Sequence, residues 1–587
     1  MMRRFLTAML GTMAGIWLSV LIFGVAVIVL IAVLAGRMAQ ETVIEENSIL
    51  YIDLTGVIDE RAVNGDVMTQ LTAVLEPSQA YNEIIFSIKK ATKDHRIKGI
   101  YINCGGSSVG IATREEIVAA LKDFKTSGKW IYAYGDNITQ GDYYIACVAD
   151  EIYLNPVGLV EIHGLSATTL FYKDLMDKVG VEAQVLKVGT YKSAVEPYIL
   201  TEMSRASREQ QSYFLGKIWD SVSGDIASMR GVTTNDVNKW ADNMIFTLPA
   251  DSLVSYGVVD NLCYRHEIES KLKSLIGVSS DNDLNLVTPH QYYSESSIEN
   301  ALEVNPHIAV LYATGNIVDS GDVGIVGDKM APMILDLAKD DNVKGLVLRV
   351  NSGGGSAFAS EQIWEALEQF KKTGKPFYVS MGDYAASGGY YISCGADKIY
   401  ADPGTLTGSI GIFGIIPCAK ELMTENLGIT SSTVKTNVNG EFPTLIEPMT
   451  MAQRNSMQAY VERGYETFVA RCAEGRDMPK DSIKRIAEGR VWDGLTAKEL
   501  GLVDEIGGLN NAVNAIASQL NMSSTEVKEY PELEVNIFAE LVANTNVAIP
   551  QQLYEENCAE LVKYIQTIKH IRTMAPMQCR MEEIIIQ

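Results

Sequence analysis

A serine found in only one of two similar passages is the first residue of this sequence that could do chemistry. The passage MGDYAASGGYYISC begins at Met381, and a near copy, YGDNITQGDYYIAC, begins at Tyr134. In the aligned passages, Ser387 falls on Gln140. The two glycines after Ser387 permit a tight turn into a helix, whose positive end would favour a developing alkoxide. Ser387 is therefore a candidate nucleophile, although a serine that only caps a helix would give the same local pattern.

A glycine-rich loop upstream of this serine could bind the anion that such a nucleophile creates. The stretch RVNSGGGSA, Arg349 to Ala357, follows a predicted strand and has three consecutive glycines. Backbone N–H groups exposed in this way can hold an oxyanion in acyl-transfer chemistry. We expect the donors to be Gly354 or Gly355, together with Gly388. A flexible turn is the alternative, and neither glycine pattern of phosphate-binding loops fits.

The base that would activate Ser387 is predicted to be a lysine. The six histidines lie outside any recognisable pairing with a carboxylate in the duplicated passages, and no GxSxG motif surrounds the serine. When VLKVGTYKSAVEPYI is aligned with its counterpart in the second copy, Lys192 falls on Gly440. A single lysine is ordinarily a surface charge, and it acts as a base only where burial lowers its pKa. However, the first copy has lost the serine and the second has lost the lysine, which indicates a pair divided between the copies.

The duplication extends along most of the chain and predicts two similar α/β domains. KGIYIN at Lys98 corresponds to KGLVLRVN at Lys344, and ADEIYLNP at Ala149 corresponds to ADKIYADP at Ala396. In the second copy, KGLVLRV is typical of a buried strand, a helix with one apolar face follows, and KPFYVSM is a second strand. The apolar face consists of Ile363, Leu367 and Phe370, and Gly374 is expected to end the helix in a left-handed conformation. Strand, helix and strand in this order predict a parallel sheet with helices on its faces.

The N-terminus predicts a membrane anchor. No charged residue occurs from Phe5 to Gly36, a run longer than the roughly 20 residues that span a bilayer core as a helix. Arg3 and Arg4 precede the run and would stay in the cytoplasm, so that the rest of the chain would be exported. The apolar region of a cleaved signal peptide is about 7–15 residues long. We therefore expect an uncleaved anchor.

Composition limits the remaining functions. The formal net charge of −24 argues against a nucleic-acid partner, because phosphates attract basic surfaces. The eight cysteines have no zinc-like spacing, so we expect no metal. We predict the following division of the chain: an anchor (1–36), a first repeat with the lysine (48–271), a linker (272–306), a second repeat with the serine (307–520) and a C-terminal helical extension (521–587).

The chain resembles the signal peptide peptidase A family in its long bacterial form with tandem domains. The similarity covers the N-terminal apolar run and the stretches VGTYKSAVEPYI, RVNSGGGSA, AASGGYYIS and TLTGSIGIFG. The resemblance implies two crotonase-like domains, similar to the Clp protease subunit, and a serine endopeptidase without a cofactor. Its substrates would be signal peptides that remain in the inner membrane. Ser387 would be the nucleophile and Lys192 the general base.

The resemblance also implies an assembly and a location. We expect a homotetramer whose active sites are shared between adjacent subunits, anchored in the inner membrane with its bulk on the periplasmic side. The sequence alone does not distinguish a serine–lysine pair within one chain from a pair between chains. One departure concerns Gly353, which stands where related proteases often have proline and should make the loop looser. Ser409, in TLTGSIG, is interpreted as a structural residue of the site wall, because the first copy has lost it without a complementary change.

Two other functions remain open at this point. The first is an acyl-CoA hydratase or isomerase of the crotonase superfamily, which would use a similar oxyanion site for a thioester enolate. The second is a membrane-tethered scaffold with a protease-like fold and no activity. The predicted anchor and the divided serine–lysine pair favour the protease over both.

Overall fold

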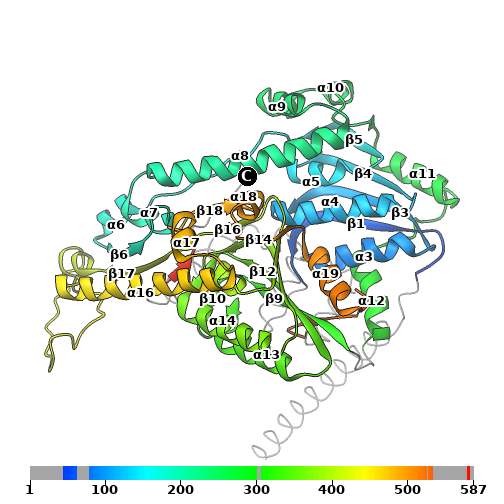
Figure 1. The fold of residues 1–587 in the computed structure, drawn as a ribbon. Coiled ribbons are helices and arrows are strands. Elements are labelled where there is room, and N and C mark those ends of the chain that lie inside the picture. Colours follow the sequence, from blue (N-terminus) through cyan, green and yellow to red (C-terminus); the bar gives the residue numbers. More distant parts are fainter. Residues whose placement is uncertain (1–43, 62–78, 301–305, 525, 533–577, 582–587) are drawn as a thin grey trace, which may run out of the picture.

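A computed structural model describes residues 44–61, 79–300, 306–524, 526–532 and 578–581 (Figure 1). The predicted anchor lies outside these ranges, as does most of the predicted helical extension. Within the described ranges, no helix has both the length and the apolar character needed to cross a membrane.

The first repeat is built around a sheet of mainly parallel strands in the order β2-β1-β3-β4-β5-β7, in which β1 also pairs with β8. Helices that follow the strands pack against this sheet, as the alternating pattern predicted. The strands are β1 (Ser48–Asp59), β2 (Gln79–Ala80), β3 (Ile97–Ser108), β4 (Trp130–Ile138), β5 (Glu151–Val160), β7 (Asn261–Leu262) and β8 (Leu286–Val287). The helices are α3 (Tyr81–Lys93), α4 (Ile111–Lys125), α5 (Gln140–Ala146), α6 (Lys173–Val179), α7 (Glu196–Ile199), α8 (Arg205–Arg230), α9 (Thr234–Asp242) and α10 (Ala250–Ser255).

The second repeat has the same plan, with strand order β18-β16-β14-β12-β9-β20; in addition, β15 pairs with β14, and β19 pairs with β15. The predicted strand, helix and strand are confirmed: β12 and β14 pair in parallel, and α14 connects them. The strands are β9 (His307–Thr314), β12 (Val343–Ser352), β14 (Phe377–Ala386), β15 (Lys398–Ala401), β16 (Leu406–Gly408), β18 (Val491–Asp493), β19 (Glu505–Ile506) and β20 (Val527–Tyr530). The helices are α13 (Gly327–Lys339), α14 (Ala357–Lys371), α15 (Gly388–Ser393), α16 (Met451–Gly475), α17 (Lys480–Ile486), α18 (Gly494–Glu499) and α19 (Leu509–Leu520).

The predicted apolar face of α14 forms part of the core. Ile363, Leu367 and Phe370 are all buried, and they belong to a cluster that also contains apolar residues of α13 and α16. Gly374 adopts a φ of +81°, the left-handed conformation expected after the helix. Helical spacing therefore predicted both which face is buried and where the helix ends.

The two repeats share a core and a buried ionic cluster. One hydrophobic cluster extends from the first repeat over α19 to residues of the second sheet, such as Val347 and Tyr378. Within the interface, the fully buried Arg349 guanidinium lies 2.9 Å from the Glu60 carboxylate and 2.7 Å from that of Glu116. Removal of Arg349 would leave the two carboxylates buried without a cation, and breaking a buried ion pair in this way typically costs about 3–5 kcal/mol. Arg349 belongs to the second repeat and both glutamates belong to the first, so these ion pairs form only when the two repeats pack together.

A further sheet joins segments of both repeats in the order β11-β10-β13-β21-β17-β6 (Figure 1). Strand β6 belongs to the first repeat and pairs antiparallel with β17 of the second repeat along seven residues. The short strand β21 lies near the C-terminus and is drawn in red in Figure 1. The bounds are β6 (Glu182–Val188), β10 (Ile317–Val318), β11 (Ile325–Val326), β13 (Gly354–Ser356), β17 (Ile412–Cys418) and β21 (Gln578–Arg580).

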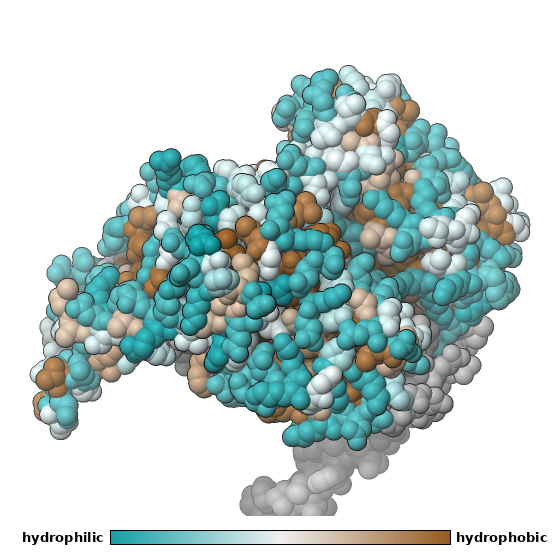
Figure 2. Space-filling view, viewed as in Figure 1, coloured by the Kyte–Doolittle hydropathy of each residue, from teal (hydrophilic) through white to brown (hydrophobic). Residues whose placement is uncertain are grey.

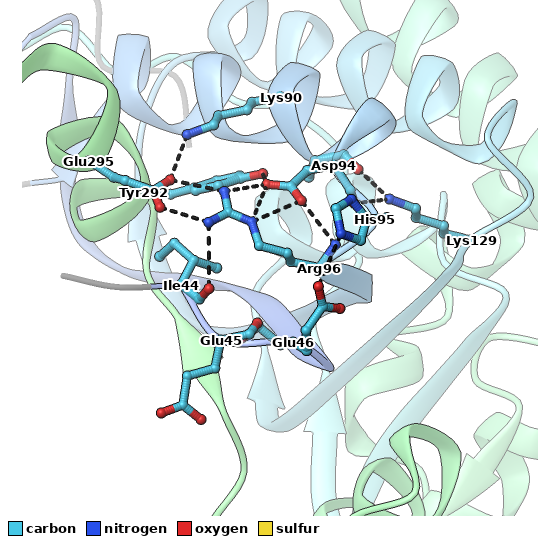
Figure 3. A network of polar contacts seen from close by, with 12 residues as sticks. Ile44, Glu45, Glu46, Lys90, Asp94, His95, Arg96, Lys129, Tyr292 and Glu295 are labelled. Atoms are coloured by element: carbon cyan, nitrogen blue, oxygen red, sulfur yellow. Dashed lines mark hydrogen bonds and ion pairs between the residues drawn. The ribbon is translucent and has the colours of Figure 1, made fainter. Parts of the chain in front are cut away.

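The segment predicted as a linker contains part of α11 (Arg265–Ile276), the strand β8 and α12 (Pro289–Asn300). Figure 3 shows how polar contacts fix α12 to the first repeat. The Arg96 guanidinium contacts the Asp94 carboxylate at 2.7 Å and that of Glu295 at 2.8 Å. The Tyr292 hydroxyl donates to Asp94 at 2.7 Å. Much of this segment is therefore packed on the first repeat.

A mostly hydrophilic surface agrees with the acidic composition of the chain. Figure 2 shows a face that is mostly hydrophilic, on which hydrophobic side chains are scattered in small groups. The described residues contain no group of three or more histidine, cysteine or acidic side chains that could hold a metal ion.

Candidate active site

Ser387 occupies a strained turn between β14 and α15. Its φ of +56° is unusual for a residue other than glycine, and α15 begins at the next residue, as the sequence predicted. The Ser387 N–H donates to the carbonyl of Gly408 at 2.8 Å, and the Ser387 carbonyl accepts the N–H of Tyr391 at 2.8 Å. These bonds hold the turn, and the structure assigns the side chain no capping hydrogen bond to the helix. The hydroxyl is thus left to other partners.

Lys192 reaches this serine from the first repeat. Strand β6 pairs with β17, and the chain then turns at Gly189 and passes beside the loop that contains Glu488. The N–H of Tyr191 donates to the Glu488 carbonyl at 2.9 Å, so the loop that precedes the lysine is fixed to the second repeat. The cross-repeat strand pair therefore delivers Lys192 to the serine.

The two predicted catalytic side chains are in direct contact. The Lys192 Nζ donates to the Ser387 Oγ at 2.7 Å. Lys192 is 1% exposed and Ser387 is 0% exposed, so bulk water is excluded from the pair. Both side chains belong to one chain. The sequence left open whether the pair forms within one chain or between chains, and in this structure the cross-repeat strand pair brings the two side chains together within one chain.

Ser409 is more than a residue of the site wall. Its hydroxyl and its carbonyl each accept a hydrogen bond from Lys192 Nζ at 3.1 Å. Its φ of +49° is also left-handed, and its N–H donates to the Arg490 carbonyl at 2.7 Å. The residue is buried and orients the amine toward Ser387. Sequence reasoning missed this contact, although the position beside glycines in TLTGSIG marked a constrained turn.

Two glycines that the sequence analysis did not select make room for the lysine. A Cβ atom at Gly489 would lie 2.7 Å from the backbone of Lys192, and Gly489 has a φ of +77°. A Cβ atom at Gly411 would lie 3.2 Å from Lys192 Cδ. Any larger residue at Gly489 would displace the lysine loop.

The glycine-rich loop lies beside the serine turn. Gly354 and Gly355 form β13, with φ values of +100° and +156°. A Cβ atom at Gly355 would lie 2.0 Å from the carbonyl oxygen of Ile317, and one at Gly389 would lie 2.5 Å from the carbonyl oxygen of Ser352. These close approaches explain why the loop and the turn after the serine need glycine.

The predicted oxyanion donors differ in their surroundings. The N–H of Gly354 donates to the Ser352 hydroxyl at 3.1 Å. Gly388 is buried as the first residue of α15, directly after the serine. The glycine loop therefore lies close to the serine turn.

The equivalent site of the first repeat is closed by its own side chains. Asp142, which aligns with Gly389, accepts the N–H groups of Gly106 and Ser107 at 2.8 and 3.2 Å. Gln140, which aligns with Ser387, accepts the N–H of Gly164 at 2.9 Å and donates to the carbonyl of the same residue. An internal carboxylate thus fills the loop that would otherwise receive an anion.

Comparison with known proteins also finds two similar regions in this chain, one in each repeat. The model of the family described as "Peptidase family S49" matches residues 123–279 and 369–523, and the two regions contain Lys192 and Ser387, respectively. Protease 4 of Haemophilus influenzae is 33% identical over 88% of this chain and 87% of its own length. The chain belongs to peptidase family S49. It is therefore a serine-type protease, and the hydratase and the inactive scaffold that the sequence left open are set aside.

A plant protein is also similar to this chain. The chloroplastic serine protease SPPA of Arabidopsis thaliana is 28% identical over 79% of this chain and 69% of its own length. Among solved structures, a ClpP1 mutant from Listeria monocytogenes covers 37% of this chain and 98% of its own chain, with 16% identity and a TM-score of 0.25.

Proposed function

We propose that Ser387 and Lys192 form the catalytic dyad of this S49 endopeptidase. The observation that supports the dyad most strongly is the 2.7 Å contact between Lys192 Nζ and Ser387 Oγ within a buried site. Burial disfavours a charged ammonium group, and a neutral amine can accept the proton of the serine hydroxyl. Ser409 holds the amine in the orientation that this transfer needs.

The reaction proceeds through an acyl-enzyme. Lys192 takes the hydroxyl proton while Ser387 Oγ attacks the carbonyl carbon of a peptide bond. The N–H of Gly388 and an N–H of the glycine loop, Gly354 or Gly355, stabilise the resulting oxyanion. The Lys192 ammonium then gives its proton to the leaving amine. Water, deprotonated by the same amine, cleaves the ester and restores both side chains. The reaction requires no metal or organic cofactor.

The substrates are extended apolar peptides, above all the signal peptides that remain in a bacterial inner membrane. This assignment rests on the motifs shared with the signal peptide peptidase A family. The apolar run from Phe5 to Gly36 anchors the chain in that membrane, and its bulk lies on the periplasmic side. Deletion of residues 1–36 should move the protein from the membrane to the soluble fraction, and an unchanged distribution would contradict the anchor.

Each repeat has a crotonase-like fold, and four chains assemble into a homotetramer with one complete dyad per chain. The extensive pairing of each repeat's parallel sheet is consistent with this fold. Analytical ultracentrifugation of the detergent-solubilised protein tests the assembly. A mass of four chains is expected, and a stable monomer that is fully active would exclude the tetramer as a requirement.

Hydrolysis of an apolar peptide by single variants tests the dyad. Ser387→Ala and Lys192→Ala should each reduce kcat by at least about a hundredfold, since a positioned base typically contributes 10²–10⁴-fold. Ser393→Ala is the matched control, because Ser393 is equally buried in α15 and its hydroxyl donates to the carbonyl of Gly389 in the same helix. Near-normal turnover of either dyad variant, with an intact fold, would exclude the assignment.

A further inference from the structure

Helix α8 contains a buried glutamine that contacts the residues on both sides of Lys192. Gln210 is 2% exposed, and its amide nitrogen donates to the Tyr191 carbonyl and to the Ser193 hydroxyl, each at 3.1 Å. Both donors of the amide are therefore used, one on each neighbour of the lysine. In Figure 1, α8 runs along the upper side of the molecule, above β18 and α18 of the second repeat.

The oxygen of the same amide connects the lysine loop with the strands that border the serine turn. The Gln210 Oε1 atom accepts the N–H of Val491, the first residue of β18, at 3.1 Å. Val491 pairs with Gly408 of β16, and the Gly408 carbonyl accepts the Ser387 N–H at 2.8 Å. One side chain of the first repeat thus connects the backbone beside the base with the backbone of the nucleophile.

The partners of this amide fix its orientation. Exchange of its oxygen and nitrogen would place the oxygen against the Tyr191 carbonyl and an N–H against the Val491 N–H, and both contacts would be repulsive. In the observed orientation, three hydrogen bonds offset the cost of removing the amide from water. The side chain is therefore matched to the lysine loop and to β18 at the same time.

The backbone N–H of Lys192 makes a weak hydrogen bond. It donates to the Gly189 carbonyl at 3.5 Å, which is longer than the usual range for an N–H donor. By contrast, the preceding residue, Tyr191, is held at both of its backbone groups. Its N–H donates to the Glu488 carbonyl at 2.9 Å, and its carbonyl accepts from Gln210 at 3.1 Å. The position of the lysine therefore depends on how its neighbours are fixed.

The next residue of α8 is a glutamine with similar burial and different contacts. Gln211 is 4% exposed, and its amide nitrogen donates to the Ser207 hydroxyl of the same helix at 3.4 Å. The hydrogen bond of Gln211 stays within α8, whereas those of Gln210 reach the lysine loop and the second repeat. Comparison of the two positions separates the effect of these contacts from that of a buried amide as such.

We propose that Gln210 is a positioning residue, which fixes the peptide groups on both sides of Lys192 and so keeps its amine within hydrogen-bonding distance of Ser387 Oγ. This inference rests on the proposed function, in which Lys192 is the general base. Gln210 acts through the backbone of the lysine loop and not on the substrate. Since a displacement of about 1 Å in a catalytic group can cost about a hundredfold in rate, loss of this support should slow the reaction strongly.

The main test is Gln210→Met in the full chain. Methionine has a similar unbranched shape and a similar helix propensity, but it removes all three hydrogen bonds. We expect kcat for an apolar peptide to fall at least about tenfold, with KM within about twofold. The rate constant for modification of Ser387 by excess fluorophosphonate should fall by a similar factor. This rate constant does not depend on how much of the enzyme is folded, so loss of stability alone would not lower it. Gln211→Met is the matched control and should change neither rate more than about twofold.

A second measurement uses the partner of Gln210 on the far side of the lysine. Ser193→Ala removes one acceptor and should lower kcat about threefold, and the combination with Gln210→Met should be no slower than Gln210→Met alone, because the shared bond is already lost. If Gln210→Met does not fold, Gln210→Glu takes its place. It retains the shape and the acceptor for the Val491 N–H, and as a carboxylate it cannot donate to the lysine loop, so the same loss is expected.

The possible outcomes separate this inference from the proposed function. Folded Gln210→Met that modifies Ser387 at the rate of the unmodified chain would overturn the positioning role, and so would equal losses in Gln210→Met and Gln211→Met. Independent, multiplicative effects of Gln210→Met and Ser193→Ala would also overturn it. In each of these cases an inactive Lys192→Ala variant would leave the dyad intact, whereas normal turnover of Lys192→Ala would refute the proposed function itself.

Discussion

The buried carboxyl group of Glu115 provides a quantitative test of how the repeats are joined. Glu115 lies on α4 of the first repeat, is 7% exposed, and accepts the N–H of Gly404 in the second repeat at 2.8 Å. Burial raises the pKa of this carboxyl to about 8, and the charges of Asp225, Asp383 and Glu116 add to the increase, while the Gly404 hydrogen bond opposes it. The group is thus protonated in the folded protein at neutral pH.

The pKa difference sets the size of the effect. The native carboxyl has a pKa of about 8 and an ordinary glutamate has 4.5, so between these values the folded state binds a proton that the unfolded state has lost. The stability that Glu115 contributes is complete below pH 4.5 and is lost as the pH rises through 8. At about 1.4 kcal/mol per pKa unit, the loss is on the order of 5 kcal/mol. Glu115→Gln cannot ionise and should not show this loss.

Guanidinium unfolding of the full chain at pH 5, 6, 7 and 8, followed by tryptophan fluorescence, measures the difference. The free energy of unfolding of Glu115→Gln, relative to that of the unmodified chain, should rise by several kcal/mol from pH 5 to pH 8. Asp123→Asn, an exposed change on the same helix, is the control and should give a constant difference. A constant difference for Glu115→Gln as well would refute the reasoning.

Three further changes test the site. Gly389→Ala should reduce kcat at least tenfold, because its Cβ would lie 2.5 Å from the Ser352 carbonyl oxygen. Gly216→Ala is the control, since it places a Cβ in open space on α8 and should leave kcat unchanged. Equal effects of the two substitutions on kcat would contradict the packing argument. Ser409→Ala should reduce kcat about tenfold with little change in KM. It removes one of the two hydrogen bonds between Ser409 and Lys192, and the loss of this bond costs about 1.4 kcal/mol. An unchanged kcat would show that the contact with the Ser409 carbonyl is sufficient to orient Lys192. Co-expressed Ser387→Ala and Lys192→Ala chains should stay inactive, because both members of the pair belong to one chain, and recovery of activity in hybrids would restore the expectation of sites shared between subunits.

The sequence carried enough information to pair Ser387 with Lys192 and to predict the main elements. Reciprocal loss of Ser387 and Lys192 from the two copies indicated that the residues act together, and the structure brings them to 2.7 Å. Period-3.6 spacing predicted the buried face of α14, since a helix that covers a sheet must bury one side. The helical spacing is a local pattern, and the reciprocal loss is visible when the two copies are aligned.

Other features depend on contacts between distant segments and could not be predicted in the same way. The pairing of β6 with β17 joins positions more than 200 residues apart, and no local pattern specifies which strand edges meet. The close approach of Gly489 to Lys192 likewise becomes visible only when the loops are placed side by side. Asp142 could be recognised as a change from Gly389 in the alignment, but its acceptance of the Gly106 N–H required the folded loop.

Covalent labelling of Ser387 tests the central claim most directly. The rate at which a fluorophosphonate probe modifies Ser387 reports activation of the hydroxyl without peptide binding, and mass spectrometry identifies the labelled residue. Lys192→Met should reduce this rate at least about a hundredfold at neutral pH, whereas Lys187→Met, a change in strand β6 close to the site, should leave it within threefold of the unmodified chain. Labelling of Ser387 in folded Lys192→Met at the rate of the unmodified chain would contradict the claim that Lys192 is its base.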